Sequence, residues 1–137
     1  MRPLFAASTL MLLSACSTLP DPDPNQAWVD LTPQDETSLH AVQVDERDWA
    51  DTRYFEVPPG SHELTVRYQF PVTPSNIGPV NEPLWRDCQL NLTFKDFGAG
   101  QRYQLQAGSI GFRPWIKLYD HQQKLLGQGL PAGCQRT

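Results

Sequence analysis

The sequence has little of what several classes of functional site require. Its three histidines (His40, His62 and His121) are scattered, and apart from Cys16 only two cysteines remain, too few for a structural zinc site. Lysine and arginine total 11 against 15 acidic residues, with no basic run, which argues against nucleic acid because phosphates must be neutralised by basic side chains. We therefore expect no metal, no cofactor and no nucleic-acid partner.

Recognisable catalytic motifs are also missing. The chain has no HExxH sequence, no nucleophile elbow and no glycine-rich phosphate loop. Ser61 and His62 are adjacent, but neighbours along a strand point to opposite faces. The acidic segment 45–51 lacks the spacing and central glycine of an EF-hand, so it is interpreted as a solvated loop. We expect no catalytic residues and no enzymatic activity.

The N-terminus has the features of an export signal. A single basic residue, Arg2, precedes an uncharged, mostly apolar run over residues 4–13, and small residues follow. The run is too short for a membrane-spanning helix, which needs roughly 20 residues. Leu13-Ser14-Ala15-Cys16 resembles the lipobox of bacterial lipoproteins, in which the cysteine thiol receives diacylglycerol and the chain is cut just before it.

This resemblance implies a signal peptide over residues 1–15 and lipidation at Cys16. Two or more acyl chains, such as palmitate, anchor a protein stably, since each buried CH₂ contributes about 0.8 kcal/mol. Ser17 stands where an Asp would resemble the inner-membrane retention signal of Gram-negative bacteria, so the outer membrane is favoured. The alternative is an ordinary signal peptide with a cysteine at the cut by chance.

Cleavage would leave 122 residues with a net charge of −5, enough for one domain with a core. Residues 16–25 are rich in proline and predict an extended tether, and residues 26–137 predict the domain. Cys88 and Cys134 would then face an oxidising periplasm, where two cysteines in a small exported domain predict a disulfide. A free thiol pair and a metal site are the alternatives.

The domain is predicted to be all-β. Apolar and polar residues alternate over 63–70, 88–94 and 103–107, which is the pattern of half-buried strands. Shorter pieces are expected over 28–31, 39–44, 53–57, 115–119 and 124–127, separated by Pro, Gly and Asp turns. Seven or eight short strands of this kind predict a two-layer antiparallel β-sandwich, or a small barrel.

Two segments are candidates for partner binding. Residues 71–85 contain four prolines and predict a long loop that carries apolar side chains. These either cap the sandwich or bind a partner. Arg113 and Trp115 form either a binding hot spot or a cation–π staple within the fold. The candidate partner-binding residues are Ile77, Val80, Leu84, Trp85, Arg113 and Trp115.

Residues 41–46, 54–68, 83–88 and 107–114 together resemble a family of small uncharacterised lipoproteins of pseudomonads and related Gram-negative bacteria. That resemblance covers most of the domain but implies no activity. Residues 55–66 resemble the hairpin of PEGA-type β-domains of cell envelopes, which supports the fold class alone.

We therefore expect an outer-membrane lipoprotein whose domain lies in the periplasm and binds another envelope protein. The alternative is a periplasmic enzyme inhibitor or immunity-type lipoprotein, as small disulfide-bonded β lipoproteins resembling lysozyme inhibitors are. A third hypothesis is a cell-wall hydrolase.

Overall fold

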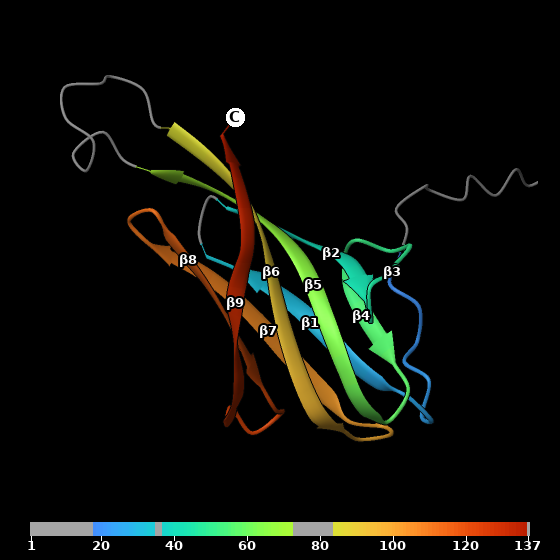
Figure 1. The fold of residues 1–137 in the computed structure, drawn as a ribbon. Coiled ribbons are helices and arrows are strands. Elements are labelled where there is room, and N and C mark those ends of the chain that lie inside the picture. The colour runs from blue at the N-terminus through green and yellow to red at the C-terminus, as the bar shows by residue number, and fades with distance from the viewer. Residues whose placement is uncertain (1–17, 35–36, 73–83, 137) are drawn as a thin grey trace, which may run out of the picture.

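A computed structural model describes residues 18–34, 37–72 and 84–136, and these ranges contain β-strands and connecting turns but no helix (Figure 1). The strands are β1 (Ala27–Pro33), β2 (Ser38–Val44), β3 (Arg47–Asp48), β4 (Tyr54–Val57), β5 (Gly60–Val72), β6 (Leu84–Phe97), β7 (Arg102–Ile110), β8 (Arg113–Tyr119) and β9 (Leu125–Arg136). The prediction of an all-β fold is confirmed. The predicted binding residues Ile77 and Val80, and the predicted lipidation site Cys16, lie outside the described residues.

The alternation seen in the sequence sets which side chains enter the core. On β5, Leu64, Val66 and Tyr68 are fully buried, whereas Arg67, on the opposite face, is exposed. The neighbouring strand β6 places Leu90 opposite Val66 in the antiparallel register, so that inward residues meet side by side. Alternation of this kind buries one face of a sheet and leaves the other polar.

The strands form one curved, mixed sheet in the order β3-β2-β5-β6-β9-β8-β7-β1-β4. The sheet folds over on itself into a sandwich-like arrangement, because strands distant in this order, such as β1 and β2, also contact each other. One half contains β3, β2, β5 and β6, the other contains β4, β1, β7 and β8, and the core lies between them. The main inward side chains are Phe55, Phe70, Leu92, Leu105, Ile116 and Leu118.

Three details differ from the predicted antiparallel sandwich of seven or eight short strands. Nine strands are present in the described residues, and β5, β6 and β9 are long, with 13, 14 and 12 residues. The pair β1–β7 is parallel, although every other strand pair is antiparallel. No hairpin joins β1 to β7, so no short connection requires them to run in opposite directions.

Strand β9 joins the two halves. Residues 125–129 pair with β8, and residues 130–136 pair with β6 (Figure 1). The cysteine pair lies in this second part: Cys134 is directly opposite Cys88, with Cα atoms 4.0 Å apart and sulfur atoms at the bonding distance of 2.12 Å. The structure thus brings together the two cysteines that the sequence predicts to pair.

The chain enters the domain at one end of the sandwich, here called the tether end. The Asp23 N–H donates a hydrogen bond to Glu56 Oε2 at 3.0 Å, and the Gly100 N–H donates to the Gln26 carbonyl at 2.9 Å. The last residues of the proline-rich segment are therefore bound to the domain. The opposite end, here called the far end, carries the start of β6, the β7–β8 turn (residues 110–113) and the end of β9 (Figure 1).

Candidate functional site

A buried carboxylate lies on the outward face of the half formed by β2, β5 and β6. Asp87 is only 7% exposed, although the alternation of β6 directs it away from the core. Gln69 faces Asp87 on β5, and Arg67 lies diagonally, two residues away on the same face. The Nε atom of Arg67 donates to Oδ1 at 2.8 Å and to Oδ2 at 2.9 Å, and Nη2 also donates to Oδ2. Bonds of this kind are stronger than neutral ones because both partners are charged.

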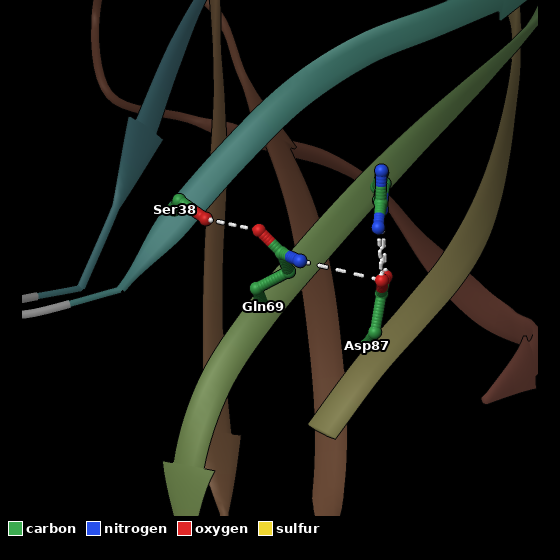
Figure 2. A network of polar contacts seen from close by, with 4 residues as sticks. Ser38, Gln69 and Asp87 are labelled. Carbon is green, nitrogen blue, oxygen red and sulfur yellow. Dashed lines mark hydrogen bonds and ion pairs between the residues drawn. The ribbon is translucent and has the colours of Figure 1, made fainter. Parts of the chain in front are cut away.

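Two further side chains hold this ion pair in place (Figure 2). The Gln69 Nε2 amide donates to Asp87 Oδ2 at 3.3 Å, and the Ser38 hydroxyl donates to Gln69 Oε1 at 3.1 Å. Figure 2 shows these groups in sequence from β2 across β5 to β6. The hydrogen bonds from Arg67 lower the pKa of Asp87, and burial opposes that effect. Asp87 is therefore a carboxylate at neutral pH.

Arg67 also lies where two open hollows of the surface meet. One, of about 520 Å³, is lined by Arg67, Asp87 and Gln89, together with β9 residues, and the other, of about 410 Å³, includes His40 and Trp49. Both hollows also include Val42. Asp87 balances the charge of Arg67, and the second hollow also contains the carboxylate of Asp48, so the groove formed by the two hollows offers hydrogen-bonding groups and one further carboxylate. Its chemistry suits the binding of polar groups.

The predicted partner-binding residues that the structure describes all lie at the far end, but on two halves of the sandwich. Trp85, on the outward face of β6, is 45% exposed, while Leu84 is half-buried and pairs with Val72. Arg113 is exposed and Trp115 is half-buried, both on β8 in the other half. The structure therefore divides the predicted set between two strands that are separated by β9.

The predicted cation–π staple has a different cation. The Nζ atom of Lys117, two residues along β8, lies 5.0 Å from the ring centroid of Trp115. Residues two apart on a strand share a face, so Lys117 reaches the ring without any change in chain direction. In the structure, the cation that lies over Trp115 is therefore Lys117, and the role of Arg113 and Trp115 in partner binding stays a prediction.

Three residues at the far end are not among the predicted partner-binding residues. The Nη1 atom of Arg86 donates to the Phe112 carbonyl at 2.7 Å, and its guanidinium lies 5.8 Å from the Phe112 ring centroid. This contact ties the β7–β8 turn to β6. Ile110, in the same turn, is 78% exposed, and Phe112 is 38% exposed. Gly111, with φ of 61°, is a residue that indicates a turn. Nothing in the sequence indicates that Phe112, the next residue, contacts Arg86.

An Asp–His pair is also present, but its geometry does not suit general-base catalysis. The Nδ1 atom of His62 lies 2.6 Å from Asp45 Oδ2, as it would in a triad, but Nε2 lies 2.7 Å from the Pro58 carbonyl. A triad histidine needs that nitrogen free to accept a proton from the nucleophile. The hydrogen bond from His62 lowers the pKa of Asp45. His62, on β5, thus contacts both Asp45 in the β2–β3 turn and Pro58 in the segment between β4 and β5.

Within the described ranges, no group of three or more His, Cys, Asp or Glu side chains is placed to hold a metal ion. The same ranges contain no apolar helix long enough to cross a membrane. Comparison of the chain with protein-family models, with curated proteins and with solved structures finds no match.

Proposed function

We propose that this chain is a lipid-anchored protein of the bacterial cell envelope, held on the outer membrane through Cys16, whose β domain binds another envelope protein in the periplasm. The lipobox-like Leu13-Ser14-Ala15-Cys16 and the apolar run before it support the anchor. The Cys88–Cys134 pair suits an oxidising compartment such as the periplasm. Binding is favoured over catalysis because His62, the histidine paired with a carboxylate, has its second nitrogen on a carbonyl.

The observation that carries the binding proposal is the position of exposed apolar side chains relative to the tether. Ile110, Phe112 and Trp85 are exposed at the far end, while the tether contacts Glu56 and Gly100 at the opposite end. A domain anchored through Cys16 would therefore direct these side chains away from its membrane. Exposed apolar side chains at one end of a domain favour that end as the site for a protein partner.

An inhibitor of a periplasmic enzyme is the second candidate, and one observation favours it. The β7–β8 turn is short, carries the 78% exposed Ile110 at its edge and is tied to β6 by Arg86. A pre-organised protruding turn loses little conformational entropy when it enters the cleft of an enzyme. Both candidates use the same far-end surface. They differ in whether the purified domain slows a wall-degrading enzyme.

The anchor is tested by the intact mass of protein extracted from membranes, before and after reduction and alkylation. We expect the mass of residues 16–137 plus acyl groups, with Cys88 and Cys134 alkylated only after reduction. A Cys16→Ser variant serves as the control and should lose the acyl mass and leave the membrane fraction. A wild-type mass without lipid would contradict the anchor.

Binding is tested by photo-crosslinking in intact cells from a benzophenone amino acid placed at Ile110. The matched control places it at Leu125, which is 44% exposed but lies at the start of β9, near the tether end. We expect a discrete adduct with one other protein from position 110 and none from 125. Equal adducts from both positions, or none from either, would refute a specific partner at the far end.

A further inference from the structure

We infer that the partner binds by adding an extended strand to the last part of β9, along the edge that faces the start of β8. This inference rests on the proposed function, because it specifies how the envelope partner would be held. Strand addition recognises main-chain groups along the edge and reads alternate side chains of the incoming segment.

The edge exists because β9 changes partner halfway along its length. Its pairing with β8 ends at Gly129, opposite Ile116, and from Leu130 onward its registered partner is β6. On the β8 side of residues 130–136, the described part of the chain therefore supplies no strand. Figure 1 shows the end of β9 running apart from β8 toward the C-terminus.

The register determines which main-chain groups face this edge. In an antiparallel pair, residues whose Cα atoms lie about 4.5 Å apart direct their N–H and C=O groups away from each other, and hydrogen-bonded pairs lie about 5.5 Å apart. The Cα atoms of Cys88 and Cys134 are 4.0 Å apart. The N–H and C=O of Cys134 therefore point away from β6, toward the open side. Those of Arg136, two residues further on, point the same way.

The start of β8 also lacks a registered partner on its β9 side. Residues 113–115 of β8 pair with β7 on one side, but the pairing of β8 with β9 begins only at Ile116. Pro114 and Cys134 lie on the inward-facing side of their strands, and both are only partly buried. A strand placed here would cover them. The occupant we infer is thus an extended segment of the partner with apolar side chains at alternate, inward positions.

The other end of the edge is limited by Pro131. The register between β6 and β9 shifts between Gln89 and Leu90, so Pro131 faces Leu90. Leu90 is two residues from Cys88 on β6, so Pro131 is placed as Cys134 is, and the nitrogen of Pro131 points to the open side. Proline has no N–H to donate, and proline and bulges are common means of ending strand pairing at an edge. An added strand would therefore pair with the part of β9 beyond Pro131.

A second copy of this chain fits the edge less well than a different protein. Antiparallel pairing of two β9 edges would direct the two tether ends in opposite directions along the strand axis, because β9 runs from the tether end to the far end. Two domains anchored through Cys16 in one membrane could not pair in this way. The lipid anchor thus favours a heterologous partner.

The first test measures residue-specific amide hydrogen exchange by NMR on the purified protein without any partner. Gly133 and Gln135 face β6 in the register and should exchange slowly, whereas Cys134 between them should exchange at least tenfold faster. Flanking slow amides distinguish an open edge from fraying of the chain end. A Cys134 amide as slow as its neighbours would mean that the edge is already covered, and would overturn the inference.

The second test repeats the cellular photo-crosslinking from Ala132, which is exposed on this edge, beside the probes at Ile110 and Leu125. We expect an adduct from Ala132 of the same mass as the one from Ile110. An adduct from Ile110 without one from Ala132 would overturn strand addition and leave the proposed function standing. No adduct from either position would overturn both. An adduct of twice the mass of this chain, or a crosslink within it, would assign the edge to a second copy or to the chain itself.

Discussion

Arg67 on β5 forms a two-pronged ion pair with Asp87 on β6, with Nε 2.8 Å from Oδ1 and 2.9 Å from Oδ2. The Asp87 carboxylate is buried while the Arg67 side chain is half-exposed. The ion pair therefore holds the guanidinium of Arg67 in a fixed position at the groove. Gln69 and Ser38 extend the same hydrogen-bonded series to β2. The series links three strands across the outward face.

We predict that Asp87→Asn lowers the free energy of unfolding at neutral pH, because Arg67 loses its charged acceptor. The pKa of Asp87 is lowered below its ordinary value of 3.8 in the folded state, so its contribution is present above that value and is lost as pH falls through the folded pKa. The difference between wild type and variant in urea unfolding should therefore shrink below about pH 4. Asp21→Asn, at an exposed residue, is the control. A difference that grows in acid would contradict this assignment.

We predict that removing the disulfide by Cys134→Ala lowers the free energy of unfolding by about 4 kcal/mol. The bond closes a loop with a sequence separation of 46 residues, and the loss of that constraint raises the entropy of the unfolded chain. Chemical denaturation of the purified domain measures the effect. The double variant Cys88→Ala, Cys134→Ala should lose a similar amount plus the packing of the fully buried Cys88. A loss below about 1 kcal/mol would contradict the chain-entropy explanation.

We predict opposite effects for two glycines on β9. A Cβ atom on Gly129 would lie 2.3 Å from Cγ1 of the buried Ile116 and 2.6 Å from the Asn91 carbonyl oxygen, so Gly129→Ala should cost about 1–3 kcal/mol. Gly127, two residues earlier, has nothing within 4 Å of that position, and Gly127→Ala should be neutral or stabilising by up to about 1 kcal/mol. Thermal unfolding of the two variants compares them directly. Equal effects of the two substitutions would mean that Gly129 is not in close contact with Ile116 and Asn91.

We predict that Tyr68→Phe changes the free energy of unfolding by less than about 0.5 kcal/mol. The Tyr68 hydroxyl is buried and, among the described residues, has no partner in hydrogen-bond geometry, so its removal should leave nothing unsatisfied. Burial raises the pKa of this phenol, while the nearby Thr37 and Ser109 act in the opposite direction. Denaturant unfolding of the variant measures the change. A cost above about 1 kcal/mol would show that the hydroxyl has a bonding partner after all.

The strands could be read from the sequence because burial of one face imposes a period of two. Leu64, Val66 and Tyr68 alternate with polar residues, and the structure buries these three side chains completely. The pairing of Cys88 with Cys134 followed from their number and the expected compartment, without knowledge of the register. Local pattern was sufficient for these features because each depends on the residues themselves, whatever strand lies beside them.

The candidate site and the open edge depend on which strands become neighbours. Ser38, Gln69 and Asp87 look like ordinary outward polar residues, and only the order β2-β5-β6 makes them one hydrogen-bonded series. Tertiary structure also decided the parallel β1–β7 pair and the passage of β9 between halves. The sequence by itself determined which face of each strand is buried, since that is a local property of alternation. Contacts between strands distant in the chain required the fold, since side-chain period carries no information about which strand pairs with which.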